Sequence, residues 1–521
     1  YKSTQKPKSS KRTYHKKKEA LMKSLLVYPN YPDTFWSFKH ALKFISKKAV
    51  HPPLGLLTIA SMLPDEWEKR LRDINVEALE DKDLEWADYV FISAMAVQKE
   101  SIKEIVHRCK KHGVKIVAGG PLFTAAHEDF EGIDHFVLNE AEITLPFFLT
   151  DLEKGEAEPI YASTEFPDVR QTPIPRWDLA PMKKYVSMNI QYSRGCPFNC
   201  EFCDITVLYG HKVRTKGREQ ILRELESLYS SGWRGSVFFV DDNFIGNRGK
   251  LKRNILPAII EWMKKRKYPF TFSTEASINL SDDEELMQMM VQAGFDAVFV
   301  GIETPNEESL AECSKFQNKN RDLVGCVRKI QKFGLRVRGG FIVGFDNDSP
   351  SIFERQIDFI QKSGIITAMV GILNAPRGTK LYKRIVQEGR LLKDISGDNT
   401  DYTTNIVPKM GFEKLNEGYR KIISGIYSPK PYHDRVKSFL KEYRPLKKKP
   451  FHFHPGHIRF HFGYSGAFFK SIWTLGIRDG ERAHYWKLLL WSLFRRPRAF
   501  PMAITYAIYG FHFRKVFQSC L

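Results

Sequence analysis

Three cysteines stand within eight residues of one another, in the string RGCPFNCEFC. Cys196, Cys200 and Cys203 have the spacing C-x3-C-x2-C. Thiolate sulfur is a soft ligand that suits iron–sulfur clusters and zinc. Three thiolates on one short loop can hold three irons of a cubane cluster, and the fourth iron then has no ligand from this motif. An iron with an open coordination position can bind and activate a small molecule, which indicates chemistry rather than electron storage.

Two other uses of these cysteines have less support. A structural zinc site usually has four ligands, often as two C-x2-C pairs. The chain has no second pair, although His211 could act as a fourth ligand. Disulfides are disfavoured because seven cysteines in 521 residues are sparse and odd in number. We interpret the other four as ordinary thiols: Cys109, Cys313, Cys326 and Cys520.

The cysteine motif follows the first of six strand-like segments that alternate with helical patterns. The strands are predicted at residues 186–192, 236–240, 270–273, 297–300, 338–343 and 366–372. The helices between them are predicted at residues 218–230, 251–265, 283–293, 321–333 and 351–362. Six strands joined by crossover helices make a (β/α)6 partial barrel. In barrels of this kind the chemistry lies on loops at the carboxyl ends of the strands.

Polar, small or turn-forming residues follow every one of these strands. After the cysteine loop, the later strands are followed in turn by Asp241-Asp242-Asn243, Glu275, Glu303, residues 344–348 and residues 374–378. A single polar loop would mean little, because turns are polar anyway. Six of them in register with a cluster-binding loop predict a shared active site on this face of the barrel.

Residues 22–150 alternate in the same way. Strands are predicted at residues 25–28, 90–93, 115–118 and 135–138, and helices at residues 54–62 and 101–112. This pattern predicts an α/β domain with a doubly wound, Rossmann-like parallel sheet, which binds ligands at the carboxyl ends of its strands. No G-x-G-x-x-G follows the first strand, so the segment is no dinucleotide fingerprint. The Gly119-Gly120-Pro121 turn either lets the backbone approach a ligand or is simply tight.

Together these features resemble the radical S-adenosylmethionine (SAM) superfamily. The cysteine motif after the first strand of a partial barrel is its signature, and Phe202 before the third cysteine also fits. A doubly wound domain ahead of the barrel resembles the cobalamin-binding branch. The strings VDDNFIGN, TEASINL, FVGIET, GGFIVGFD and SGDNTDYTTN resemble a subgroup with a C-terminal extension. That subgroup includes hopanoid methylases and archaeal tetraether-lipid ring-forming enzymes, and the resemblance covers residues 22 to about 430.

The resemblance implies three cofactors and a mechanism. The cysteines ligate a 4Fe-4S cluster whose open iron chelates SAM, and one electron cleaves the sulfonium C–S bond. The resulting deoxyadenosyl radical abstracts hydrogen from an unactivated carbon. In cobalamin-dependent methylases a second SAM methylates cobalamin, which delivers the methyl group. The protein supplies positioning and the exclusion of water.

Polar residues at the strand ends have candidate roles toward SAM. Asp242 and Asn243 are acceptors suited to its ammonium group. Arg214 suits its carboxylate through the planar guanidinium fork. Glu275 and Glu303 are candidates for the ribose hydroxyls. The alternative role for each of these residues is to cap a helix or to form a turn.

Glycines and loop residues complete the expected sites. Gly340 and Gly344 would let the fifth strand lie against the adenosine, unless they only bend the barrel. The residues expected near cobalamin are Ser93, Gln98, Gly119, Gly120, Pro121, Asn139 and Glu140. The string D-x-H-x-x-G, whose His ligates cobalt in many cobalamin proteins, is absent. Cobalamin can bind without such a ligand; the alternative is a vestigial domain or another ligand.

The rest of the chain is divided by composition. We expect a basic, disordered leader at residues 1–21, with Met22 as the natural start, and a polar, proline-containing linker at 151–185. The barrel is assigned to 186–395, a family-specific extension to 396–446 and a basic aromatic helical tail to 447–521. Residues 25–429 carry 54 basic and 55 acidic side chains, so the net charge of +21 comes from the ends. A neutral body disfavours a nucleic-acid channel.

The tail interleaves aromatic and basic residues. Trp486, Trp491, Phe494 and Phe500 lie beside Arg495, Arg496 and Arg498, a composition suited to a membrane interface. The alternative is a helical subdomain that packs these aromatics on the barrel. The chain has no uninterrupted apolar run long enough for a confident transmembrane helix. A metal site is disfavoured at four tail histidines that lack a carboxylate partner, His452, His454, His457 and His461.

These features favour an enzyme that methylates an unactivated carbon of a small-molecule or lipid-like substrate with cobalamin. We expect an external electron donor of the ferredoxin or flavodoxin type and a cytoplasmic location, with peripheral contact at the inner membrane face. The alternative in the same subgroup is a radical enzyme that closes C–C bonds in lipids. An RNA-modifying enzyme is disfavoured because residues 1–108 contain no cysteines for a second cluster. A non-catalytic electron-transfer or binding protein would not need six polar strand ends.

Overall fold

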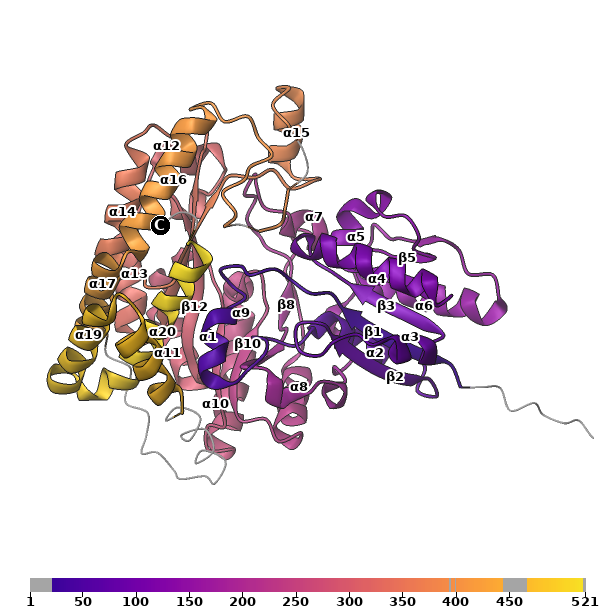
Figure 1. Ribbon diagram of the computed structural model, residues 1–521. Helices are drawn as coiled ribbons and strands as arrows, with labels where there is room; N and C mark the ends of the chain where they lie inside the picture. Colours follow the sequence, from indigo (N-terminus) through magenta and orange to yellow (C-terminus); the bar gives the residue numbers. More distant parts are fainter. Residues whose placement is uncertain (1–20, 393–394, 399, 444–465, 519–521) are drawn as a thin grey trace, which may run out of the picture.

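A computed structural model describes residues 21–392, 395–398, 400–443 and 466–518 of the chain. It shows two parallel β-sheets followed by a group of helices (Figure 1). This arrangement confirms the predicted α/β fold with a doubly wound domain, a partial barrel and a mostly helical C-terminal extension. Residues 1–20 of the predicted leader and residues 447–465, with the four tail histidines, lie outside the described residues.

The first sheet has six parallel strands in the order β2-β1-β3-β4-β5-β6. The strands are β1 Lys23–Tyr28, β2 Glu68–Asp73, β3 Tyr89–Ser93, β4 Lys115–Gly119, β5 His135–Val137 and β6 Ile160–Tyr161. The helices are α1 Lys39–Leu42, α2 Leu54–Met62, α3 Asp81–Trp86, α4 Lys99–Lys111, α5 Pro121–Ala126 and α6 Ala141–Lys154. Leu26 of β1 packs into one hydrophobic core, while Leu25 and Val27 pack into another. Both faces of the sheet are therefore buried, which is why its inner strands are continuous apolar runs.

Two strands of this sheet were not predicted. β2 has the sequence EKRLRD, in which only Leu71 and Asp73 are buried. It is an edge strand that pairs with β1 alone, so it does not need an apolar sequence. β6 has two residues and gives no periodic signal.

The second sheet confirms the predicted partial barrel, with parallel strands in the order β14-β13-β12-β11-β10-β7. The strands are β7 Ser187–Ile190, β10 Gly235–Phe239, β11 Phe270–Glu275, β12 Phe295–Glu303, β13 Arg336–Val343 and β14 Ala368–Ile372. The helices are α7 Ile205–Tyr209, α8 Arg218–Ser230, α9 Arg248–Lys250, α10 Leu256–Lys265, α11 Glu284–Ala293, α12 Glu307–Glu312, α13 Leu323–Lys332 and α14 Ile352–Ser363. Two short strands outside the sheet, β8 Ser193–Arg194 and β9 Arg214–Thr215, pair antiparallel.

The barrel is open between its edge strands β7 and β14, and the N-terminal domain spans this opening. Trp36 donates its indole N–H to Met369 Sδ of β14 at 2.9 Å. Asn189 of β7 donates from Nδ2 to the Pro52 carbonyl at 3.2 Å. Residues 31–53 therefore contact both edges of the barrel and wall off its interior.

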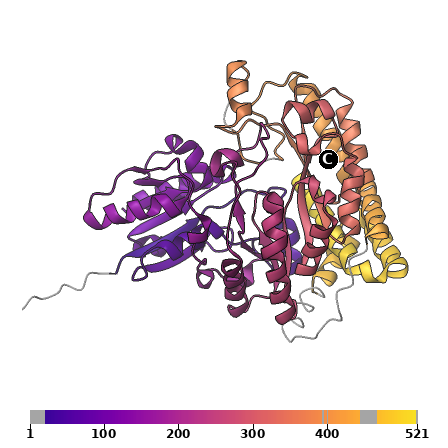
Figure 2. The ribbon, with the colours of Figure 1, turned by 180° about the vertical axis from the view of Figure 1, so that it is seen from behind.

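The C-terminal helices follow the barrel, and most of them lie on its side away from the first sheet (Figure 2). They are α15 Lys380–Gln387, α16 Phe412–Tyr427, α17 Pro429–Glu442, a helical segment at residues 466–478, α19 Arg482–Arg495 and α20 Phe500–Val516. α16 packs closely on α14, because the Phe353 ring lies against Gly418, where a Cβ atom would be 2.1 Å from it. α20 returns to the N-terminal segment, where Phe513 stacks on Phe35 with ring centroids 4.4 Å apart.

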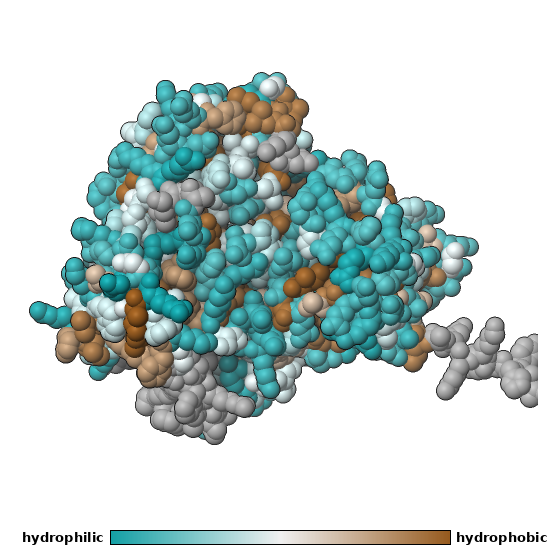
Figure 3. Space-filling model, viewed as in Figure 1, coloured by the Kyte–Doolittle hydropathy of each residue, from teal (hydrophilic) through white to brown (hydrophobic). Residues whose placement is uncertain are grey.

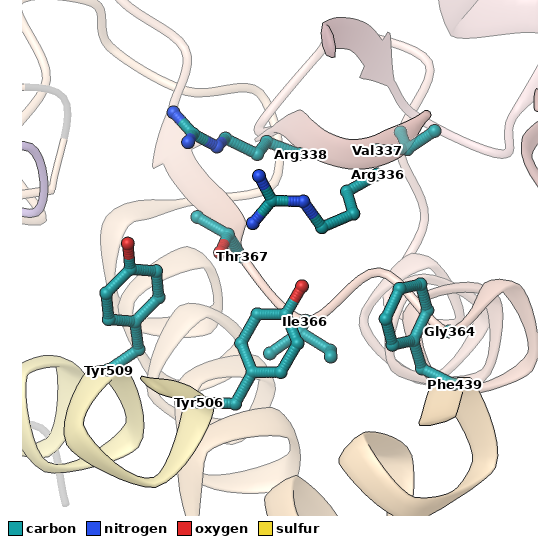
Figure 4. A pocket seen from close by; sticks show the side chains of 9 residues that line it. All are labelled: Arg336, Val337, Arg338, Gly364, Ile366, Thr367, Phe439, Tyr506 and Tyr509. Carbon is teal, nitrogen blue, oxygen red and sulfur yellow. The ribbon is translucent and has the colours of Figure 1, made fainter. Parts of the chain in front are cut away.

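The amino end of the barrel strands is closed by α20. Arg336 and Arg338 at the start of β13 face Tyr506 and Tyr509 of α20 around a hollow of about 10 Å³ (Figure 4). That volume is about one water molecule. Arg336 is paired with Asp296 at 2.7 Å. Side chains fill the amino end of the barrel, so a ligand larger than a water molecule has to approach from the opposite, carboxyl end.

None of the helices within the described residues combines the length and the apolar sequence that crossing a bilayer requires.

Candidate active site

The cysteine loop begins directly after β8. Asp241, which follows β10, binds the residues at the start of this loop. The buried carboxylate of Asp241 accepts hydrogen bonds from the Tyr192 N–H at 3.1 Å, from Ser193 Oγ at 2.6 Å and from the Ser193 N–H. Burial raises the pKa of Asp241 to about 7, although these hydrogen bonds oppose the shift. Asp241 thus fixes the start of the loop and leaves ligand binding to its neighbours.

The other side of the loop is tied to the C-terminal extension. Glu201, between the second and third cysteines, donates its N–H to the Cys313 carbonyl at 2.9 Å and accepts from the Leu381 N–H at 3.0 Å. Its carboxylate forms a two-pronged pair with Arg384 of α15, with N–O distances of 2.7 and 3.0 Å. Arg384 also contacts Asp346 at 2.9 Å. Cys313, interpreted from the sequence as an ordinary thiol, therefore lies beside the cysteine loop.

The three thiols share one environment. Cys200 interacts electrostatically with Cys196 and Cys203, and Lys315 lies close enough to interact with all three. Gln317 Nε2 is 3.7 Å from Cys200 Sγ. Burial raises the pKa of Cys196 and Cys203, so a bound metal centre is what would hold them as thiolates at neutral pH. Three cysteine sulfurs on one loop fit three irons of a cluster.

Within the described part of the chain, no group of three or more histidine, cysteine, aspartate or glutamate side chains is placed to hold a single metal ion.

A buried ion pair stands beside the cysteines. Glu303 Oε1 is 2.6 Å from Lys315 Nζ. Burial acts to lower the pKa of Lys315, but Glu303 and Cys200 raise it above its ordinary value, so Lys315 stays charged. Glu303 has a φ of +65°, a strained conformation for a long side chain, at the end of β12. A Cβ atom on Gly301 would come within 2.3 Å of Glu303 Oε1, so glycine makes room for the pair.

Two carboxyl groups nearby form no ion pair with a side chain of the described residues, although Arg194 acts on Asp242 electrostatically. Asp242 Oδ2 is buried and has no hydrogen-bond partner in the described structure. Burial, with Asp204 adding to it, raises the pKa of Asp242 to about 6. Burial raises the pKa of Glu275 to about 8, and the charges of Asp242 and Asp241 act in the same direction. A ligand that brings a positive charge would satisfy both carboxylates.

Two of the residues predicted for SAM are engaged with protein partners. Asn243 is buried, and its Oδ1 accepts from the N–H and the hydroxyl of Ser277 at 3.3 and 3.4 Å. It therefore joins the turns after β10 and β11. The ring of Phe299 covers Gly340, where a Cβ atom would be 2.7 Å from it. The close packing of β12 on β13 explains this glycine, in agreement with the barrel-bend alternative.

Gly344 and Phe202 also have defined surroundings. Gly344 has a φ of +99° and donates its N–H to Asp348 Oδ2 at 2.9 Å, so it is a turn glycine. The Phe202 ring lies 6.4 Å from the Phe345 ring and 5.9 Å from Lys315 Nζ. Phe202 thus packs from the cysteine loop onto the loop after β13.

A cavity of about 720 Å³ lies between the two domains. Its volume is within the range of small-molecule and cofactor sites. The carboxyl ends of β1, β3, β4 and β5 form one wall, where the predicted residues Ser93, Gly119, Gly120, Pro121, Asn139 and Glu140 lie. The barrel contributes another wall, which includes Asn189, Arg194, Tyr209, Phe238, Asp242 and Met369. The cavity therefore joins the predicted cobalamin face to the predicted SAM face.

The structure corrects the prediction for Gln98. Its side chain is fully buried outside the cavity wall, donates to the Pro29 carbonyl at 2.6 Å and accepts from the Met95 N–H at 2.9 Å. Gln98 therefore joins the loops after β1 and β3. Gly120 has a φ of +91° and a Cβ atom on it would be 2.5 Å from Ser93 Oγ, so the turn is tight as well as open to the cavity.

Arg214 and Glu140, predicted for two different cofactors, contact each other. Two nitrogens of Arg214 lie 2.7 and 3.0 Å from the carboxylate of Glu140. Arg194 contacts the same carboxylate at 2.6 Å and Glu142 at 2.8 and 3.0 Å. All four side chains are largely buried. Arg214 and Glu140 thus both belong to an interdomain ion-pair network. The guanidinium of Arg214 pairs with a protein carboxylate instead of a ligand carboxylate.

Sequence reasoning missed Lys315, Arg194, Glu142 and Arg384. Lys315 is twelve positions from Glu303, and Arg194 is more than fifty from Glu140 and Glu142. The only local signal was that Arg194 stands two residues before the first cysteine.

Three family matches cover most of the chain. Residues 44–149 match the B12 binding domain and residues 190–360 match the radical SAM superfamily. Residues 379–521 match a domain of unknown function (DUF4070).

Relatives extend over nearly the whole length. An uncharacterized methyltransferase of Synechocystis is 43% identical, over 94% of this chain and 91% of that protein. The hopanoid C-2 methylase of Rhodopseudomonas palustris is 34% identical, over 90% of this chain and 89% of that protein. Among solved structures, the cobalamin-dependent SAM radical enzyme OxsB with aqua-cobalamin bound shares the fold, with a TM-score of 0.61 and 17% identity over 96% of this chain and 80% of that one.

Proposed function

Since this chain belongs to the family of cobalamin-dependent radical SAM methylases, we propose that it transfers a methyl group to an unactivated carbon of a lipid-like substrate. The family assignment confirms the resemblance seen in the sequence. It also confirms the three cofactors, a 4Fe-4S cluster, SAM and cobalamin. The observation that carries the proposal is one shared cavity, onto which the B12 binding domain and the radical SAM barrel both open.

On the barrel side, the donor set of the cysteine loop suits the cluster. Cys196, Cys200 and Cys203 would ligate it, while Asp241 and Glu201 hold the two sides of the loop. When bound, the cluster supplies the electron that cleaves SAM, and cobalamin carries the methyl group. The protein's part is to position these groups and to exclude water.

We assign the charged residues near the loop to SAM. Asp242 and Glu275 form no ion pair within the described residues, which supports a role toward the ammonium or sulfonium charge. Lys315 is a buried cation that interacts with all three cysteines, which supports a role toward the SAM carboxylate in place of Arg214. Glu303 would hold Lys315 and stay within reach of the ribose hydroxyls.

On the N-terminal side, we assign the strand ends to cobalamin. Ser93, Gly119, Gly120 and Asn139 line the cavity where a doubly wound sheet binds its ligands. The only histidine among the lining residues in the described structure is His51, which packs on Phe238 of the barrel with ring centroids 5.3 Å apart. Cobalamin would therefore be held without a histidine from the N-terminal sheet.

A lipid-like substrate is supported by the apolar and aromatic part of the wall. Phe35, Trp36, Met62 and Met369 line the cavity where residues 31–53 cover the open side of the barrel. Such a surface suits a hydrocarbon and keeps water from a reactive carbon radical. The named substrate of the R. palustris relative, a hopanoid, is of this class.

Two further parts of the proposal concern partners. The family uses external reductants, and we propose a ferredoxin or flavodoxin as the donor. We also propose that the protein works in the cytoplasm at the inner face of a membrane, where a lipid substrate is available. The free cysteines of the described chain support a reducing compartment.

Lipid analysis of the host organism, with and without the gene, tests the methylation. The proposal predicts a lipid that carries one extra methyl group only when the gene is present. A product that instead lacks two hydrogens would identify the cyclising alternative. Unchanged lipids would exclude both.

A further inference from the structure

The C-terminal region carries an apolar surface that the catalytic site does not use. Residues 466–478 and α19 form an antiparallel pair of helices, here called the tail hairpin, residues 466–495. Large apolar side chains on its outer side are between 36% and 77% exposed: Phe469, Trp473, Ile477, Trp486, Leu490, Leu493 and Phe494. They recur about every four residues, so each helix presents one apolar stripe to solvent. Figure 3 shows brown surface at this corner of the molecule, at the lower left.

These side chains are in addition to the hairpin's own core. The inner faces bury Leu475, Tyr485 and Leu488 almost completely. The two helices are joined by a hydrogen bond between Ser471 Oγ and the Tyr485 hydroxyl at 2.8 Å. The inner contacts therefore hold the two helices of the hairpin together without help from the outer stripes. An exposed apolar patch of this kind marks an interaction surface.

The charge around the stripes is mostly positive. Residues 466–498 contain seven basic side chains and two acidic ones. Both acidic residues, Asp479 and Glu481, are in the turn between the helices. Arg482, Lys487, Arg495 and Arg498 are exposed. Aromatic and aliphatic stripes bordered by cations are typical of helices that lie in the interface of an anionic bilayer.

We propose that the tail hairpin is the surface with which this protein lies on an anionic membrane, with its apolar stripes at the boundary of headgroups and acyl chains. A second copy of the chain fits this surface poorly, because a symmetric dimer would bring the same cations face to face. The position suits a lipid-modifying enzyme, since α20 packs on α19 and also on Phe35, which lines the cavity. In this respect the inference rests on the proposed function, although membrane binding itself does not require catalysis.

Flotation of the full chain with lipid vesicles tests the proposal. Vesicles of phosphatidylcholine alone are compared with vesicles that also contain phosphatidylglycerol, at low and high salt. We expect the protein to float with the anionic vesicles and to bind less at high salt. The double variant Phe469→Ser and Phe494→Ser should bind more weakly by roughly tenfold for each phenylalanine removed.

A matched control and a charge variant sharpen the test. Phe147→Ser with Ile160→Ser removes side chains of comparable exposure from the N-terminal domain, and this variant should float like the wild type. Arg482→Gln, Lys487→Gln and Arg495→Gln together should weaken binding to anionic vesicles by roughly fivefold per charge, with little effect on neutral vesicles.

Three outcomes would overturn the proposal. The wild type does not float, the Phe469→Ser and Phe494→Ser variant floats as well as the control, or the stripes instead mediate a dimer that these substitutions dissociate. SAM cleavage by each variant is measured in detergent. A variant that loses flotation but keeps SAM cleavage supports the surface independently of which lipid is methylated.

Discussion

The interdomain ion-pair network makes a quantitative prediction for Glu140→Gln. Glu140 accepts three short hydrogen bonds from Arg194 and Arg214, and together with Glu142 it balances their two positive charges. Although burial opposes it, Arg194 lowers the pKa of Glu142 to about 2. The substitution keeps the size of the side chain and removes one negative charge.

The magnitude follows from the burial of the network. The side chains of Arg194 and Arg214 are 11% exposed and that of Glu140 is 3% exposed. Removing one partner of a buried pair leaves an uncompensated charge, which costs about 3–5 kcal/mol. Glutamine retains one acceptor oxygen, so we expect a loss near the lower end of that range. The Glu142 carboxylate still pairs with Arg194, and the loss falls mainly on Arg214.

Denaturant unfolding of the chain, followed by tryptophan fluorescence, measures this loss. The matched control is Glu100→Gln in the same domain, whose pair with Lys103 is exposed and should be worth less than about 1 kcal/mol. The transition of Glu140→Gln should move to clearly lower denaturant with an unchanged slope. If the two variants lose the same small free energy, the network does not hold the domains together and the reasoning is wrong.

Three further predictions concern the carboxyls, the loop and the SAM site. The folded protein keeps a proton on Glu275 up to a pKa of about 8, against an ordinary value of 4.5, so the free energy of unfolding of the ligand-free protein should fall as the pH rises between these values. Glu275→Gln should remove part of that slope in a series of unfolding curves, and an unaltered slope would contradict the assignment. Arg384→Lys keeps the charge but loses the fork on Glu201, so the reconstituted protein should hold less iron and release it faster to a chelator; iron retention equal to the wild type would count against the clamp. Lys315→Met should weaken SAM binding by about tenfold or more in equilibrium dialysis, since a charged hydrogen bond is worth about 1.5–3 kcal/mol, and unchanged binding would remove Lys315 from the site.

The regular elements were predictable because they carry strong periodic patterns. α2 and α8 have the predicted bounds, and all six barrel strands overlap the predicted segments. β12 continues to Glu303, three residues beyond the predicted end. The prediction stopped early because Gly301 is small and Glu303 is charged, so the apolar run in the sequence ends before them. The edge strand β2 was missed for the same kind of reason: its burial is too slight to impose an apolar sequence.

Only those residues of the candidate site that follow the ends of predicted strands could be predicted from the sequence. The spacing of the cysteines identified them, and the rule that functional residues follow the carboxyl ends of strands then led to Asp242 and Glu275. That rule could not show that Arg214 is taken by Glu140, because these residues are 74 positions apart and meet only through domain packing. Nor could it separate Asp241, which holds the loop, from Asp242, which has a free buried oxygen, since they are neighbours in the chain.

The most direct test of the central claim is methyl transfer by the anaerobically reconstituted protein, supplied with cobalamin, a reductant, SAM labelled in its methyl group and a lipid extract. We predict labelled lipid together with 5′-deoxyadenosine, and neither product from the Cys200→Ala variant. Deoxyadenosine formation without label in any lipid, or label transfer that survives Cys200→Ala, would contradict it.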